Sequence, residues 1–104
     1  MSYSIRLRPG VLDDLREASS WYEERESGLG SELERCFFSA LAKILREPEW
    51  FLAAYGNVRR VILDRFPYTL WFRIEADVVV VFLLWHAARS PQMLKRLLRQ
   101  REVD

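Results

Sequence analysis

The spacing of apolar residues divides the chain into strand-like and helix-like segments. Residues 3–7 alternate apolar and polar side chains, which predicts a short first strand. Apolar residues then recur at helical spacing over residues 11–25, and Pro9 has the fixed φ that suits a first helical turn. The two glycines of segment 28–30 predict a turn after this helix.

A second helix has the clearest apolar stripe in the sequence. Its apolar residues recur every three or four positions over residues 29–45, and Pro48 ends it. Ser31 and Glu34 have the spacing of a capping box, and Ser27 is the alternative cap. Because the two helices are joined by a short turn, we expect an antiparallel hairpin that buries its apolar faces against a sheet.

The C-terminal half of the chain predicts that sheet. Residues 58–63 have the pattern of a strand, and residues 68–74 alternate apolar and polar side chains. Residues 75–77 form a tight connection to residues 78–85, which are continuously apolar, as expected of a central strand covered on both faces. Because these connections are too short for crossovers, the three strands should form an antiparallel meander.

The chain ends in a short amphipathic helix with many basic residues. Ser90 and Pro91 suit its N-cap and its first position. The element order is therefore β-α-α-β-β-β-α in a single domain spanning residues 1–104. We expect an α+β fold in which the helical hairpin packs on a small, mostly antiparallel sheet, with the first strand beside the last.

Composition favours a folded cytoplasmic protein. The chain has 104 residues, of which 50% are hydrophobic and 13% aromatic, so it can bury a core without disulfides or metals. Cys36 is the only cysteine and lies in the apolar stripe of the second helix, which predicts inert packing in a reducing compartment. We find no signal peptide and no apolar run of the ~20 residues that a membrane span needs.

Charge is distributed unevenly. Residues 1–50 carry a net charge of −3, whereas residues 51–104 carry +4. A basic half suits contact with nucleic acid or with an acidic protein segment. An ordinary solvated surface is the alternative explanation of the same pattern.

A series of short motifs extends over nearly the whole chain. They are Asp14-Leu15, Trp21-Tyr22-Glu23, Gly28-Leu29-Gly30, Pro48, Val58-Arg59-Arg60, Arg65-Phe66-Pro67-Tyr68, and His86-Ala87-Ala88-Arg89 with Pro91. In this order and at these spacings the motifs resemble the RelE/ParE superfamily, the toxins of bacterial type II toxin–antitoxin modules. The resemblance is greatest to the ParE-like, or plasmid stabilisation, branch.

This resemblance implies a small growth-inhibiting toxin that a cognate antitoxin neutralises. ParE-type members poison DNA gyrase, and RelE-type members cleave mRNA on the ribosome without a metal, so a shared fold cannot decide between the two activities. We expect gyrase to be the target, with mRNA endonuclease activity as the alternative. The third hypothesis is that the protein is a degenerate, non-toxic member that only binds its partner.

An endonuclease would need a proton-transfer group and cations at one phosphate. The candidate catalytic residues are His86, Arg65 and Arg89. His86 is the only side chain with an ordinary pKa near neutrality, about 6.5. The strands lack the lysine, and the C-terminal segment lacks the tyrosine, that some RelE-type proteins use, which lowers our expectation of catalysis. We expect neither a metal nor an organic cofactor.

Structural roles compete with each catalytic assignment. His86 follows a buried strand, and a structural hydrogen bond there is its alternative role. Arg65 is suited to pair with Asp64 or Glu75 across a turn, and Arg89 is suited to fix the last helix.

A second set of side chains is expected to contact nucleic acid or the protein target, with core packing as the alternative for the tryptophan among them. The set is Arg60, Arg73, Trp71, Lys95, Arg96 and Arg99. The antitoxin is expected to use a groove along the hairpin, a strand edge or the basic last helix. A homodimer or a heteromer with the antitoxin is expected if part of the apolar hairpin surface stays open.

Overall fold

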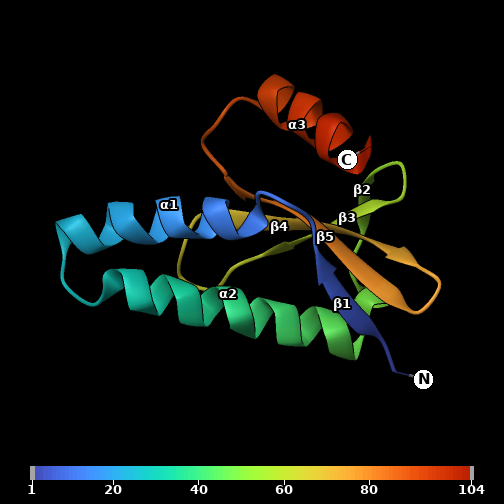
Figure 1. Ribbon diagram of the computed structural model, residues 1–104, viewed down its shortest axis with the longest axis horizontal. Helices are drawn as coiled ribbons and strands as arrows, with labels where there is room; N and C mark the ends of the chain where they lie inside the picture. Colours follow the sequence, from blue (N-terminus) through green and yellow to red (C-terminus); the bar gives the residue numbers. More distant parts are fainter. Residues whose placement is uncertain (1, 104) are drawn as a thin grey trace.

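One five-stranded sheet separates two helical layers, with the hairpin of α1 and α2 on one face and α3 on the other (Figure 1). The computed structural model describes residues 2–103, and side chains through residue 101. In chain order the elements are β1 (Ser4–Leu7), α1 (Val11–Arg25), α2 (Leu29–Arg46), the 3₁₀ helix η1 (Pro48–Trp50), β2 (Ala53–Tyr55), β3 (Val58–Ile62), β4 (Tyr68–Glu75), β5 (Val78–His86) and α3 (Pro91–Val103).

The strand order is β1-β5-β4-β3-β2. β3, β4 and β5 form the predicted antiparallel meander, in which Val61 lies opposite Leu70 and Leu70 lies opposite Leu84. β1 is parallel to β5, with Ile5 opposite Val79, so the expected position of the first strand beside the last is confirmed. The α+β fold and its predicted order of elements are also confirmed.

Two short elements between α2 and β3 were not predicted. η1 and β2 have three residues each, which is too short to show a helical or strand period. β2 pairs with β3 at the edge of the sheet, where Ala53 lies opposite Arg59 and the register shifts before Tyr55.

The helix starts also differ from prediction. α1 begins after Gly10, which has φ 98°, so Pro9 lies outside the helix. α2 begins after Gly28, which has φ 95°, and the N–H groups of Gly28 and Gly30 donate to the Glu23 carboxylate of α1. Neither Ser27 nor Ser31 is the cap, because a glycine in the left-handed conformation already starts the helix at this tight turn. The predicted start of the last helix is correct: α3 begins at Pro91, and the Met93 N–H lies 3.4 Å from the hydroxyl oxygen of Ser90, the N-cap.

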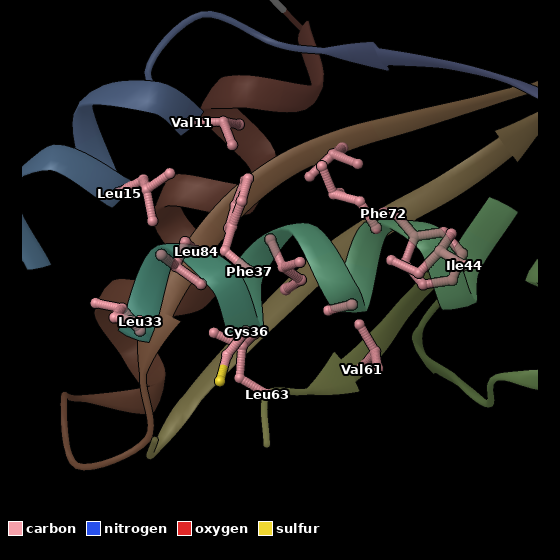
Figure 2. Packing of buried hydrophobic residues seen from close by; sticks show 14 of the residues in the cluster. Val11, Leu15, Leu33, Cys36, Phe37, Ile44, Val61, Leu63, Phe72 and Leu84 are labelled. Carbon is pink, nitrogen blue, oxygen red and sulfur yellow. The ribbon is translucent and has the colours of Figure 1, made fainter. Parts of the chain in front are cut away.

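The larger core lies between the hairpin and the sheet (Figure 2). The α2 stripe contributes Leu33, Phe37 and Ile44, which are fully buried, and β4 contributes the fully buried Phe72. Cys36 is buried in the same layer, as expected, and burial raises the pKa of its thiol. Each fully buried large side chain contributes about 1.5–3 kcal/mol of hydrophobic stabilisation.

A smaller core lies between the sheet and α3. Trp71 and Phe82 from the strands pack there with Leu94 and Leu98 from α3. β5 is therefore covered on both faces, which confirms its prediction as a fully buried strand.

β5 contains an irregularity at its centre that the sequence did not reveal. Trp71 pairs with Leu83 but Phe72 pairs with Val81, so Phe82 is an extra residue on β5. This bulge places Phe82 and Leu83 in the same α3-side cluster, where strict alternation would separate them.

Candidate functional site

A cavity of about 340 Å³ opens where the hairpin meets the ends of β4 and β5. Glu17, Trp21 and Tyr22 reach it from α1, and Tyr68 and His86 reach it from β4 and β5. Arg89, from the connection to α3, also lines it. The cavity therefore collects acidic, basic, aromatic and titratable side chains in one place.

His86 is half-buried in this cavity, and its ring already has two neighbours. Its Nδ1 accepts a hydrogen bond from the Ala88 N–H at 3.0 Å, which corresponds to a ring that carries its proton on Nε2 when neutral. The Tyr68 ring meets it edge-to-face, with centroids 5.0 Å apart. The structural hydrogen bond weighed for His86 is present, and His86 still lines the cavity.

Tyr68 remains a phenol under ordinary conditions. Burial raises its pKa most, Tyr22 and Glu17 raise it further, and Arg89 lowers it. The Arg89 guanidinium lies over the Trp85 ring at 4.2 Å. Arg89 is thus held at the cavity by an aromatic contact and carries a positive charge there.

Arg65 lies outside the cavity. It has φ 70° in the turn between β3 and β4, and it forms an ion pair with Glu32 of α2. Its partner is therefore neither Asp64 nor Glu75, the two that the sequence suggested. The structure brings together only His86 and Arg89 of the three candidate catalytic residues.

The tryptophan among the candidate target-binding residues is a core residue. Trp71 is 2% exposed, and Tyr55 stacks on its ring with centroids 5.5 Å apart. It cannot serve as the open platform that a nucleotide base needs, so that assignment is corrected to core packing. Arg60 lies over Trp71 with its guanidinium carbon 6.0 Å from the ring centroid.

The four other candidate cations lie on the α3 side of the sheet. Arg73 donates to Glu75 at 2.7 Å and lies over the Phe82 ring. Lys95 of α3 lies over the Tyr55 ring at 5.3 Å. Arg96 and Arg99 are exposed on α3. Thus Arg73 is engaged with a carboxylate, whereas the α3 cations face solvent.

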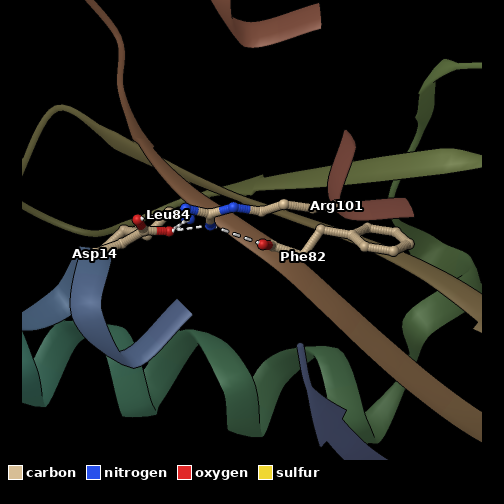
Figure 3. Close-up of polar contacts among 4 residues, drawn as sticks. All are labelled: Asp14, Phe82, Leu84 and Arg101. Carbon is tan, nitrogen blue, oxygen red and sulfur yellow. Dashed lines mark hydrogen bonds and ion pairs between the residues drawn. The ribbon is translucent and has the colours of Figure 1, made fainter. Parts of the chain in front are cut away.

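An ion pair that sequence reasoning missed joins α1, β5 and α3 (Figure 3). Arg101 Nη1 donates to Asp14 Oδ2 at 2.6 Å, and Nη2 donates to Oδ1 at 3.0 Å. The pair also binds the bulge, because Arg101 donates to the Phe82 carbonyl and Asp14 accepts from the Leu84 N–H. Two backbone groups of β5 that lie beyond its pairing with β1, which ends at Val81, thereby gain hydrogen-bond partners.

Trp21 is the other residue whose role the sequence understated. It is 49% exposed, and the Arg25 guanidinium lies 3.3 Å from its ring centroid. It lines the cavity beside Tyr22. The Trp21-Tyr22-Glu23 motif was the sequence feature that could have indicated this role of Trp21.

Two features are absent from the described residues: a metal-binding cluster and a membrane-spanning helix. Within residues 2–103, no three or more His, Cys, Asp or Glu side chains gather in a way that would hold a metal ion. Among the described helices, none combines the length and the apolar character needed to cross a membrane.

Comparisons with known proteins agree with the motifs. Two curated sequences from Mycobacterium tuberculosis, both named Toxin ParE2 and from strains CDC 1551 / Oshkosh and H37Rv, are 26% identical over 96 residues, covering 91% of each chain. A solved structure titled "Chromosomal ParDE TA system from P. aeruginosa" superposes with a TM-score of 0.73 at 12% identity, covering 82% of this chain and 96% of that one. No family model matches the sequence.

In sequence the chain is similar to ParE2 toxins, and in fold it is similar to a ParDE toxin–antitoxin structure. Both likenesses agree with the motifs and support a ParE-like toxin of the RelE/ParE superfamily.

Proposed function

We propose that the protein arrests growth by binding DNA gyrase and that a cognate antitoxin neutralises it. The position of Arg65 is the observation that favours contact over catalysis. RNA cleavage without a metal needs acid, base and cations around one phosphate. Arg65 is instead tied to Glu32, outside the cavity that holds His86 and Arg89.

The cavity offers few groups for a second proton transfer beside His86. Burial raises the pKa of Tyr68, and an arginine such as Arg89 makes a poor base. His86 Nδ1 already accepts the Ala88 amide hydrogen, which leaves Glu17 as the other candidate base that lines the cavity.

The antitoxin partner is supported by an apolar surface at the sheet edge. Trp50 is 78% exposed and Leu52 is 84% exposed, immediately before the short edge strand β2. Arg59 donates to the carbonyls of Glu49 and Phe51, at 3.1 and 2.7 Å, and so holds this segment in place. Exposed apolar side chains beside an unpaired edge suit a partner segment that adds a strand.

Antitoxin binding at this edge can be tested with the cognate antitoxin co-expressed. Trp50→Ser with Leu52→Ser should abolish rescue while toxicity persists. Phe38→Ser is the matched control, because Phe38 is 54% exposed on α2 and should leave rescue intact. Full rescue of the double variant would remove this edge from the antitoxin interface.

The target is tested by inducing the chain alone in a bacterial host and following translation, mRNA integrity and the DNA-damage response separately. A gyrase poison should give filamentation and a DNA-damage response with intact mRNA. Rapid translation arrest with cleaved mRNA would instead establish an endonuclease. Induction without any effect on the host would establish that the protein is a degenerate, non-toxic member.

Endonuclease activity is the second candidate, because one cavity holds His86, Tyr68 and Arg89 together. The two mechanisms differ in what they require of His86. Toxicity through contact with gyrase should survive His86→Gln, whereas catalysis should be lost in a variant that still folds and binds antitoxin. Thermal unfolding of the purified variant provides the folding control.

A further inference from the structure

The chain contains a long segment without acidic residues, and this segment builds one side of the molecule. No Asp or Glu occurs between residues 78 and 101, which form β5, the following connection and most of α3. The segment carries five Arg or Lys residues. Arg101 is engaged with Asp14, which leaves Arg89, Lys95, Arg96 and Arg99.

These four cations have no carboxylate partner in the described part of the chain. Arg89 and Lys95 lie over the rings of Trp85 and Tyr55, and all four are exposed. By contrast, exposed cations of the hairpin such as Arg16 and Arg35 have carboxylate partners one helical turn away. The α3 cations are therefore available to an external anion.

Two of them border a hollow between α3 and the edge of the sheet. The hollow has a volume of about 370 Å³ and is lined by Tyr55, Val58, Lys95, Leu98 and Arg99. Lys95 and Arg99 are one helical turn apart, so their side chains lie on the same side of α3. Two cations at the rim of a partly apolar hollow suit a phosphate group.

We propose that the exposed face of α3 binds the phosphate backbone of duplex DNA through Lys95, Arg96 and Arg99. The burial of the aromatic rings on this face favours duplex DNA over a single strand as the ligand. Single-strand binding sites stack bases on open aromatic rings. Here Trp71 and Trp85 are 2% and 3% exposed. Tyr55 is half-buried, but its ring stacks on Trp71 and has Lys95 over it, so the surface offers cations without an open stacking platform.

The distribution of charge favours a local site over general attraction. The formal net charge is only +1, so the protein as a whole attracts DNA weakly. Contacts to about three phosphates should give a slope of about −2.7 for log K against log salt, or about 40-fold weaker binding between ~50 and ~200 mM salt. This DNA contact is independent of which enzyme the toxin inhibits.

The experiment is fluorescence anisotropy of a labelled duplex of mixed sequence, titrated with the full chain at several salt concentrations. The triple variant Lys95→Gln, Arg96→Gln, Arg99→Gln should bind at least about tenfold more weakly at ~50 mM salt and lose most of the salt slope. The matched control is Arg16→Gln, Arg35→Gln, Arg46→Gln, which removes the same charge from the hairpin. It should bind within about twofold of wild type.

A footprint on the unmodified protein tests the same surface without any variant. The chain has only two lysines, Lys43 on α2 and Lys95 on α3. Duplex DNA should slow acetylation of Lys95, measured by mass spectrometry, and leave Lys43 unchanged. This measurement keeps the test decisive if the triple variant fails to fold.

Several results would overturn the inference. They are equal losses in the two triple variants, undetectable binding by wild type at ~50 mM salt, equal protection of both lysines, and tighter binding of single-stranded RNA of the same length. Preferential protection of Lys95 by an acidic peptide with none by DNA would assign the surface to a protein partner instead.

Discussion

The two faces of the sheet are built differently. The hairpin face has the larger core, in which residues such as Phe37 and Ile44 are fully buried, and its outer surface carries ion pairs one helical turn apart. The α3 face has a smaller core, and its cations Lys95, Arg96 and Arg99 have no carboxylate partner among the described residues. One face holds the fold together by packing, whereas the other leaves charge available for binding.

The way each helical layer is attached also differs. α1 and α2 contact each other along their lengths and share a close approach at Gly30. Among the described residues α3 has no neighbouring helix of comparable contact, and Arg101 joins it to Asp14 of α1 and to the Phe82 carbonyl of β5. Local opening should therefore begin at α3, because the less densely packed part of a fold opens at lower free energy.

The largest expected effect comes from the hairpin core. Phe37→Ala should lower the free energy of unfolding by about 3–5 kcal/mol, because Phe37 is fully buried between α2 and the sheet. Urea unfolding monitored by circular dichroism would measure the loss. Leu98→Ala is the matched change in the α3 core and should cost about 2–3 kcal/mol. A greater cost for Leu98→Ala would reverse the ranking of the two faces.

The next effect concerns the attachment of α3. Arg101→Ala should cost about 2–4 kcal/mol, because it leaves the Asp14 carboxylate, 17% exposed, without its cation and the Phe82 carbonyl without its donor. Hydrogen exchange should show faster opening of α3 and little change in the hairpin.

A double-mutant cycle tests whether this cost belongs to the pair. Asp14→Ala combined with Arg101→Ala should cost less than the sum of the single changes, because neither partner is then left uncompensated. Additive costs would show that Arg101 stabilises α3 by packing rather than through Asp14.

A smaller effect is expected where the helices of the hairpin approach each other. A Cβ at Gly30 would lie 2.6 Å from the Ser19 carbonyl oxygen of α1, so Gly30→Ala must move the helices apart. The expected cost is about 1–3 kcal/mol, measured by chemical denaturation. Gly56→Ala is a useful contrast, because no atom lies near that Cβ and only its φ of 56° opposes the change.

Much of the fold could be predicted from the sequence because its main elements are regular. The stripe of α2, which includes Leu33, Phe37 and Ile44, has a strict helical period, and β5 has a continuous apolar run. β2 was not predicted because three residues are too few to show a periodic pattern of apolar side chains. The bulge at Phe82 was not predicted because a single extra residue has no periodic pattern of its own.

The candidate site was less predictable because it depends on distant pairs. Asp14 and Arg101 are 87 positions apart, and Arg65 and Glu32 are 33 apart. Single-sequence patterns report local spacing and carry no information about such partners. By contrast, His86 and Arg89 are close in sequence, and their joint presence in the cavity agrees with the motif that first drew attention to them.

The smallest expected effect is pH-dependent and lies at the hairpin turn. The Glu23 carboxylate accepts hydrogen bonds from the Gly28 and Gly30 N–H groups, and these bonds lower its pKa below the usual 4.5. A lowered pKa in the folded state means that the stabilisation is fully present above pH 4.5 and is lost as the pH falls through the folded pKa. Glu23→Gln should therefore destabilise the protein near neutrality, and the difference from wild type should shrink in acid. Thermal unfolding of both proteins across this pH range measures that difference, and a difference that is constant with pH would exclude the carboxylate charge as its cause.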